Sequence, residues 1–268
     1  MNFTESLRAV QRRQRSLLCI GLDPDSARLP QALAGEVDPI FAFCAAIMAA
    51  TADLACAFKP NIAFFEALGP AGLATLARIC ALPRRVPLIL DAKRGDIGST
   101  AEAYARMAFD VYDADAVTLS PYLGADSLEP FLRRPERGCF LLCKTSNPGS
   151  ADLQDLPLAS GEPLYMAVAR LAGGRWNANG NVGLVAGATH PAAVAAVRAA
   201  CPDLPLLVPG VGAQGGALAE AVRVAVDARG ELALISASRS ILYASAAADF
   251  ADAARAEALR MVEAIRAL

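Results

Sequence analysis

The sequence repeats one pattern eight times: a short apolar run is followed by a polar turn and then by an Ala-, Leu- and Arg-rich segment of helical spacing. Apolar runs of this length, bounded by turns, predict strands that are buried on both faces. The expected strands cover residues 17–22, 55–58, 86–90, 116–119, 139–143, 182–186, 206–208 and 232–235. Eight alternating units in one chain predict an α/β fold, a parallel (β/α)₈ (TIM) barrel, rather than an open sheet.

One barrel accounts for the length of the chain. The sequence has 268 residues, and a barrel of this kind typically uses about 250. No Ser- or Pro-rich linker divides it, so we expect a single barrel domain over residues 1–268, with an extra amphipathic helix over about 2–15. The two longest connections, 23–38 and 145–162, follow expected strands, and long loops after strands form the functional face of a barrel.

Composition excludes several classes of protein. Hydrophobic residues make up 55% and charged residues 19%, which excludes a disordered chain, and a net charge of −2 gives no basic field for nucleic acid or an anionic membrane. The most apolar stretch, 39–58, contains Asp53 and ends before Lys59, so it lacks the run of about 20 apolar residues that a membrane span needs. The first apolar run stops at Asp23, too soon for a secretion signal. We expect a cytoplasmic protein.

Cysteine and histidine usage limits the chemistry further. The seven cysteines are odd in number, form no CxxC pair and lie mostly in apolar runs, which predicts buried free thiols in a reducing compartment. His190 is the one histidine, so a two-histidine metal site is impossible, and its place in GATHP predicts a polar residue at a helix start. We expect neither a metal site nor a cofactor.

Lysine is rare and placed in one kind of position. Of the 25 basic residues, only Lys59, Lys93 and Lys144 are lysine, and they follow the second, third and fifth expected strands. The carboxyl ends of barrel strands carry the catalytic groups. A lysine ammonium can give up a proton, whereas an arginine keeps its charge. The lysines are therefore candidates for proton transfer, although a solvated loop position is the expected fate of Lys144.

The segment LDAKRGDIGST carries the strongest local signal. Asp91 and Lys93 are two residues apart, so both should point to one face of the strand end, and Asp96 follows in the loop. Two carboxylates beside one ammonium raise the pKa of the lysine and make it a proton donor. They also place negative charge where a substrate would bind; if that substrate presents a carboxylate there, the repulsion relaxes when carbon dioxide leaves. The alternative is a surface ion pair followed by a helix cap at Ser99 or Thr100.

The last two loops predict a phosphate site. The segment Pro209–Gly216 (PGVGAQGG) contains four glycines, which allow backbone N–H groups to turn toward an anion near a helix start. Arg239 follows the eighth expected strand and offers a bidentate phosphate contact. Barrels often bind phosphate at these two loops. A tight structural turn and a surface arginine remain the alternative.

Together these motifs resemble one family. The string DAKRGDIGST is similar to the signature of orotidine 5′-phosphate decarboxylases. The likeness extends over nearly the whole chain, through GLDPD, FKPNIAFFE, KTSNPGS, GAT, PGVGAQGG and the Arg239 loop. The segment TSNPGS and the chain length resemble the bacterial type 2 branch. The resemblance implies conversion of orotidine 5′-monophosphate to uridine 5′-monophosphate (UMP) and carbon dioxide, the last step of de novo pyrimidine synthesis, without a cofactor.

The resemblance also implies roles for individual residues. Lys93 would protonate the pyrimidine carbon, Asp91 would lie beside the leaving carboxylate, and Lys59 would bind the ribose and join the charged network. The other implied substrate contacts are Asp23 with the ribose, Ser146 (or Thr145) with the pyrimidine edge, Pro209 with the ring, and Gln214 and Arg239 with the phosphate. The family pairs its barrels face to face, so a homodimer is implied in which Asp96 and Thr100 reach into the partner's site.

Two other functions remain open at this point. One is a metal-dependent sugar-phosphate decarboxylase or aldolase with the same barrel, which would need carboxylates placed around a divalent ion. The other is a non-catalytic nucleotide-binding barrel. Lys59, Asp91, Lys93 and Asp96 are all present, and a degenerate binder would more readily have lost one of them.

Overall fold

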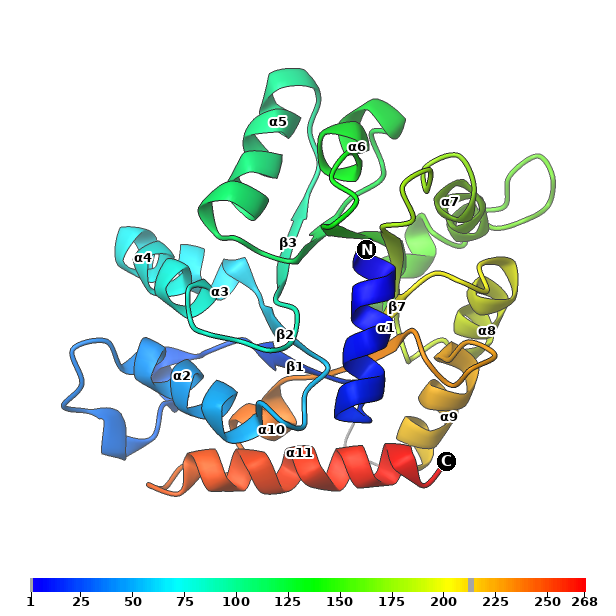
Figure 1. Ribbon diagram of the computed structural model, residues 1–268. Helices are drawn as coiled ribbons and strands as arrows, with labels where there is room; N and C mark the ends of the chain where they lie inside the picture. The colour runs from blue at the N-terminus through cyan, green and yellow to red at the C-terminus, as the bar shows by residue number, and fades with distance from the viewer. Residues whose placement is uncertain (1, 212–214) are drawn as a thin grey trace.

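The computed structural model describes residues 2–211 and 215–268 and shows a closed parallel barrel (Figure 1). The strands are β1 (Leu18–Leu22), β2 (Ala57–Pro60), β3 (Ile89–Arg94), β4 (Ala116–Leu119), β5 (Gly138–Lys144), β6 (Val182–Ala186), β7 (Leu206–Val208) and β8 (Ala233–Ala237). Their order in the sheet is β2-β1-β8-β7-β6-β5-β4-β3, and isolated parallel bridges, Phe58 with Leu88 and Asn61 with Asp91, join β2 to β3. The barrel prediction is confirmed.

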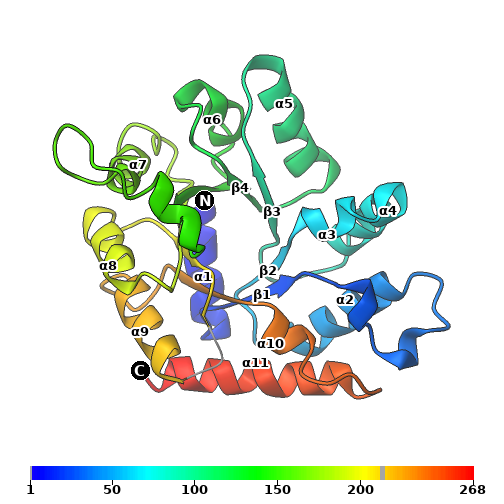
Figure 2. The ribbon, with the colours of Figure 1, turned by 180° about the vertical axis from the view of Figure 1, so that it is seen from behind.

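Helices surround the strands on the outside of the barrel, as both views of the ribbon show (Figures 1 and 2). The helices are α1 (Phe3–Gln14), which lies across one end of the barrel, and α2 (Pro39–Thr51), α3 (Ile62–Glu66), α4 (Gly69–Cys80), α5 (Gly98–Arg106), α6 (Ala125–Leu132), α7 (Leu164–Gly173), α8 (Pro191–Ala200), α9 (Gly215–Ala225), α10 (Arg239–Leu242) and α11 (Phe250–Arg266). Short 3₁₀ turns lie at Ser26–Arg28, Gln31–Leu33 and Pro148–Asp152, and a π-helical turn, Met107–Val111, directly follows α5. None of the helices that the structure describes is long and apolar enough to cross a membrane.

The lysines lie inside the strands, not after them as the sequence pattern predicted. Lys59 is the third residue of β2, Lys93 is the fifth of β3, and Lys144 is the last of β5. The apolar run marks only the part of each strand that packs in the core. In β2, β3, β5 and β8 backbone pairing continues beyond that run, so sequence patterning places the ends of these four strands too early, whereas the ends of the other four agree with it.

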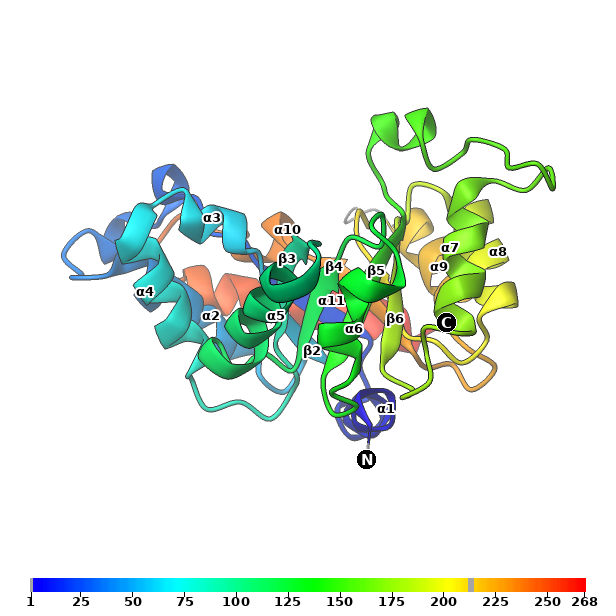
Figure 3. The same cartoon turned by 90° about the horizontal axis from the view of Figure 1, so that it is seen from above.

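Helix α1 closes the amino-terminal end of the barrel. Phe3 and Leu7 are buried against strand residues that point into the barrel, and the ring of Phe3 meets that of Phe140 edge-on at 5.9 Å. Figure 3 shows α1 at one end of the molecule and the long β5–α7 connection at the other. The carboxyl ends of the strands are therefore the open face, where barrels place their active sites.

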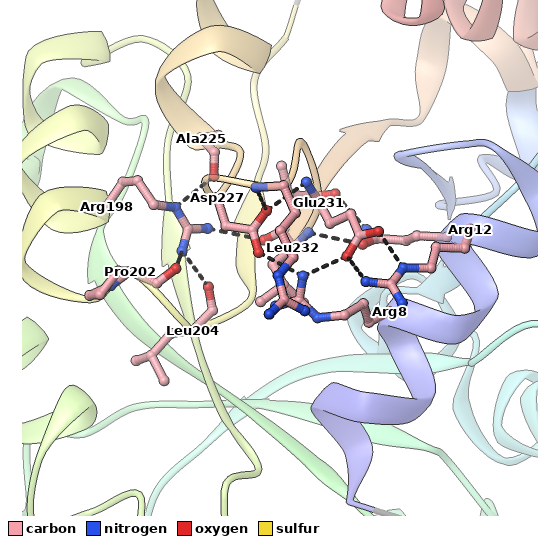
Figure 4. A network of polar contacts seen from close by, with 12 residues as sticks. Arg8, Arg12, Arg198, Pro202, Leu204, Ala225, Asp227, Glu231 and Leu232 are labelled. Atoms are coloured by element: carbon pink, nitrogen blue, oxygen red, sulfur yellow. Dashed lines mark hydrogen bonds and ion pairs between the residues drawn. The ribbon is translucent and has the colours of Figure 1, made fainter.

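A polar network fastens α1 to the β7–β8 side of the barrel (Figure 4). Arg8 donates to Asp227 at 2.7 Å and to Glu231 at 2.5 Å, and Arg12 also pairs with Glu231. Below them, Gln11 is 3% exposed; its amide donates to the carbonyl of Ala233 and its carbonyl accepts from the N–H of Leu232. Gln11 thus satisfies two buried backbone groups that the last strand leaves unpaired.

Replacing Gln11 tests this arrangement. We expect Gln11→Met to lower the free energy of unfolding by about 2–4 kcal/mol, because two buried backbone groups lose their partners. The matched control is Gln14→Met, which removes one bond to the exposed carbonyl of Ala52, where water can replace it. Urea denaturation of both variants measures the difference. Equal losses in the two variants would contradict the role given to Gln11.

Candidate active site

The centre of the open face is a carboxylate held between two ammonium groups. Asp91 of β3 accepts from the Nζ of Lys59 at 2.9 Å on one oxygen and from the Nζ of Lys93 at 2.5 Å on the other. Lys59 comes from β2, so this ion cluster spans the β2–β3 join. The side chain of Asp91 is 11% exposed and that of Lys59 only 6%. The predicted Asp91–Lys93 pair therefore exists, with Lys59 as its third member.

Burial and charge act in opposite directions on these groups. Burial alone would raise the pKa of Asp91, but the charges of Lys59 and Lys93 overcome it and lower that pKa to about 2. Burial would likewise lower the pKa of Lys59, and the nearby carboxylates of Asp91 and Asp23 raise it above its usual value. Asp91 and Lys59 are thus both charged at neutral pH, with Asp91 as a fixed anion.

Lys93 differs from Lys59 in exposure and in backbone conformation. Its side chain is 48% exposed, so its ammonium can exchange protons with water. Its φ of 49° lies in the left-handed region, which costs a non-glycine residue about 1 kcal/mol. Strain of this kind persists only where surrounding contacts hold it, and it is common at functional sites.

Asp23 lies beside the cluster, at the end of β1. Its Oδ1 atom is buried and has no hydrogen-bond partner among the described residues. A buried acceptor without a donor is costly, so this atom fits a ligand hydroxyl. The loop that carries Asp23 is anchored by Tyr243, the residue that follows α10, because the Tyr243 hydroxyl accepts from the N–H of Asp25 at 2.6 Å.

Ser146 lies where three loops of the open face meet. The side chain of Thr189 donates to the carbonyl of Ser146, and a Cβ on Gly187 would lie 2.7 Å from the N atom of Ser146. Only glycine permits this approach. The carbonyl of Pro209 accepts from Ala188, which joins the β7 loop to the same group. The GAT turn therefore brings Ser146 and Pro209 together.

The neighbouring hydroxyl, on Thr145, is already used. Gln154 donates to it at 2.8 Å, and it donates in turn to Asn147 at 2.7 Å. The hydroxyl of Ser146 makes no such contact with any residue that the structure describes. Of the two candidates for contact with a ligand, Ser146 is the one whose side chain is available.

The predicted phosphate end is only partly described. Arg239 begins α10 directly after β8, is exposed, and makes no ion pair within residues 2–211 and 215–268. Gln214 lies outside the described residues. The β7 loop reaches its described limit at Val211, after Gly210, whose φ of 86° only glycine adopts readily.

Asp96 and Thr100 do not join the lysine cluster of their own chain. The carboxylate of Asp96 accepts from the N–H of Ile97 at 2.8 Å, and Thr100 is exposed on the first turn of α5. Ile97 between them is a large apolar side chain that is 58% exposed. The tight Asp-Lys-Asp grouping expected from the sequence is therefore an Asp91–Lys93 pair within this chain, with Asp96 turned elsewhere.

Comparisons with known proteins identify the family of this chain. The model of the Orotidine 5′-phosphate decarboxylase / HUMPS family matches residues 16–256. The chain belongs to this family. It is 62% identical over 267 residues to an orotidine 5′-phosphate decarboxylase of Roseiflexus sp. strain RS-1, covering 100% of this chain and 98% of the relative. The relative from Herpetosiphon aurantiacus is 56% identical over 254 residues, which cover 94% of each chain.

Solved structures of the family share the fold. The Leishmania donovani OMP decarboxylase is 45% identical, with a TM-score of 0.85 and 100% of both chains covered. The Leishmania donovani UMP synthase gives a TM-score of 0.88 at 46% identity; all of this chain is covered, but only 56% of the synthase.

Within residues 2–211 and 215–268, no group of three or more His, Cys, Asp or Glu side chains is arranged to hold a metal ion.

The expectation that Lys144 is a solvated loop residue is wrong. Its side chain is 2% exposed, and its ammonium donates to both oxygens of Asp155, at 2.7 and 2.8 Å, and to the hydroxyl of Ser150 at 3.0 Å. These contacts fold the first part of the β5–α7 connection back onto the end of β5. Sequence reasoning failed here because Asp155 is eleven residues away and no local pattern pairs the two.

Sequence reasoning also missed Thr118. This residue of β4 is 1% exposed, and its hydroxyl donates to Asp91 at 2.9 Å. The available signal was weak: Thr118 is the one polar residue in the expected strand AVTL. A single threonine in a strand is too common to indicate a site, and its partners became evident only when β3 and β4 were paired.

The lowered pKa of Asp91 predicts a pH-dependent stability. A carboxyl whose pKa is about 2 in the folded protein and about 3.9 in the unfolded chain contributes about 2–3 kcal/mol above pH 5, about half of which remains at pH 3. We expect Asp91→Asn to be less stable than the wild type at pH 7, and the gap to narrow as the pH falls. Urea denaturation from pH 7 to pH 3 measures both curves. A constant gap would contradict the ionised Asp91.

Two variants of the ion pair between the buried Lys144 and the half-exposed Asp155 should differ in stability. Lys144→Met removes the buried charge and fills its volume, so we expect a loss of about 1 kcal/mol or less. Asp155→Asn leaves the buried ammonium with neutral partners only, the asparagine carbonyl and the Ser150 hydroxyl, so we expect a loss of about 3 kcal/mol. Chemical denaturation of the two variants gives the order, and the reverse order would show that Lys144 is not buried as described.

Proposed function

We propose that Lys93 is the proton donor with which this chain, a member of the orotidine 5′-phosphate decarboxylase family, converts orotidine 5′-monophosphate to UMP and carbon dioxide in pyrimidine biosynthesis. The observation that carries the proposal is the ionised Asp91 between Lys59 and Lys93 on the open face of the barrel. Membership of the decarboxylase family supplies the substrate. The geometry supplies a fixed anion and a proton in contact with it.

The charges give each residue a separate task. A substrate carboxylate placed beside Asp91 is repelled by it, and the repulsion disappears when the carbon–carbon bond breaks and neutral carbon dioxide leaves. The electron pair stays on the ring carbon, and the Lys93 ammonium donates its proton there. Because Lys93 is half exposed, water can return the proton. Lys59 is buried and remains charged, which keeps Asp91 ionised throughout the cycle.

The remaining predicted residues would hold the nucleotide. Asp23 would accept from the ribose hydroxyls through its unpartnered oxygen. Ser146 would contact the pyrimidine edge and Pro209 would pack on the ring, because the GAT turn brings the two together. Arg239 would bind the phosphate with a guanidinium that has no carboxylate partner among the described residues, and Gln214 would assist it.

A homodimer completes the proposal. Asp96 and Thr100 lie at the start of α5, next to the exposed Ile97, and contribute nothing to the lysine cluster of their own chain. An exposed apolar side chain beside two polar side chains that do not contact the lysine cluster of their own chain suits an interface between subunits. In the dimer, Asp96 would approach the partner's Lys93 as a second carboxylate, and Thr100 would contact the nucleotide bound there.

A reducing, cytoplasmic location fits the same chain. All seven cysteines are described, and each is a buried free thiol. Burial raises the pKa of Cys19 and of Cys143 to about 12, so these thiols are inert at neutral pH.

The first experiment follows the ultraviolet absorbance of orotidine 5′-monophosphate in excess chelator. We expect the wild type to turn over, and Lys93→Ala to lose at least about 1,000-fold in kcat because the proton donor is gone. Lys144→Met serves as a lysine control and should retain most of the activity. A wild type that is folded and inactive would overturn the proposed function, and activity that depends on added magnesium would favour a metal-dependent relative.

A mixing experiment tests the dimer. Lys93→Ala and Asp96→Ala remove residues of one composite site from different chains, so each variant alone is inactive. Random reassortment of the two should restore about a quarter of the wild-type activity, because half of the dimers are mixed and each has one intact site. The mixture is assayed as in the first experiment. No recovery after verified subunit exchange would place Asp96 outside the partner's site.

A further inference from the structure

The end of β3 does not pair regularly with β4. Leu90 lies opposite Val117 and Arg94 lies opposite Leu119, so three residues of β3 face the single residue Thr118. Such a bulge redirects side chains and leaves backbone groups without ladder partners. The three residues are Asp91, Ala92 and Lys93, and two of them belong to the ion cluster.

The hydroxyl of Thr118 pairs with backbone N–H groups of β3 that the bulge leaves without partners in β4. It accepts from the N–H of Ala92 and from the N–H of Lys93, each at 3.0 Å, and it lies 2.9 Å from Oδ1 of Asp91. A hydroxyl has one proton and two acceptor positions. Because two amide donors fill the acceptor positions, the proton points to Asp91.

This fixed proton has two consequences for the cluster. Oδ1 of Asp91 receives donors from both Thr118 and Lys93, and the other oxygen receives Lys59. A proton on Oδ1 would therefore meet two donors and no acceptor, which favours the ionised carboxylate. The bond to the N–H of Lys93 also fixes its backbone, where φ is 49°, and so sets the direction from which its ammonium approaches Asp91.

We infer that Thr118 is a positioning residue for decarboxylation, which holds Asp91 as an anion and aims Lys93 through one buried hydroxyl. The inference rests on the proposed function, because it assigns Thr118 a part in the chemistry of Asp91 and Lys93. Thr118 acts only through these two residues. Its loss should therefore slow the chemical step and leave nucleotide binding nearly unchanged, because the proposed ribose, pyrimidine and phosphate contacts lie on other strands.

The test compares variants with and without the hydroxyl. Thr118→Val has nearly the same shape and no hydroxyl, and Thr118→Ser keeps the hydroxyl. We expect Thr118→Val to lower kcat about 10- to 100-fold, which corresponds to about 1.4–2.7 kcal/mol, with KM and the inhibition constant of UMP within about threefold of the wild type. Thr118→Ser should retain kcat within about threefold. Thr118→Ala gives a second hydroxyl-free variant in case valine prevents folding.

A matched control uses another buried threonine that donates to an aspartate. Thr75 of α4 is 6% exposed and donates to Asp38 at 2.6 Å, away from the ion cluster. Thr75→Val should lose stability and keep kcat. The unchanged affinity for UMP separates positioning from a general loss of structure, which would weaken binding and turnover together.

The outcomes distinguish the proposed function from the role inferred for Thr118. A wild type that turns over while Lys93→Ala does not supports the proposed function whatever Thr118 does. Given that result, the inference is overturned if the hydroxyl-free variants keep kcat within about twofold, if they lose UMP binding in step with kcat, or if Thr118→Ser is as slow as Thr118→Val. A wild type without turnover removes the proposed function and this inference together.

Discussion

The ion cluster of Asp91 with Lys59 and Lys93 holds together the place where the barrel has the least backbone pairing. Strands β2 and β3 meet through isolated bridges and not through a continuous ladder. A bond between Lys59 of β2 and Asp91 of β3 crosses this join at 2.9 Å. The same contact closes the fold and keeps Asp91 ionised, so structure and chemistry depend on one interaction. Replacing Asp91 would leave the buried Lys59 charge without its ion-pair partner, and replacing Lys59 would leave Asp91 with Lys93 alone.

In the rest of the barrel, the contacts that stabilise the fold and the groups proposed for chemistry lie at opposite ends. At the amino-terminal end, Phe3 fills the mouth of the barrel and Gln11 pairs the backbone left over by β8. At the carboxyl end, the groups are strained, exposed or unpartnered: Lys93 has a positive φ, Arg239 is exposed, and Asp23 has a buried oxygen without a donor. A rigid closed end allows the open end to carry these unfavourable features.

Much of the site was predictable because its residues follow the barrel rule. The rule places functional groups at the carboxyl ends of strands, and it located Lys59, Asp91 and Lys93 from the sequence alone. It failed for contacts between residues that are distant in sequence. Thr118 meets Asp91 only across the β3 bulge, and the partner of Lys144 lies within a long loop that carries no regular pattern. Asp96 is close to Lys93 in sequence, yet within its own chain its carboxylate accepts from the N–H of Ile97.

The sequence by itself determined the eight strand–helix units, the apolar faces that bury them, and the residue types available for chemistry, because periodicity and composition act locally along the chain. Only the tertiary structure decided which of those residues meet. The closure of β2 on β3 placed the ammonium group of Lys59 beside Asp91, and the bulge opposite Thr118 turned Lys93 toward the same carboxylate. Charge interactions decay with distance and depend on burial. The reactivity of Asp91 and Lys93 is therefore a property of the folded barrel and not of the motif that contains them.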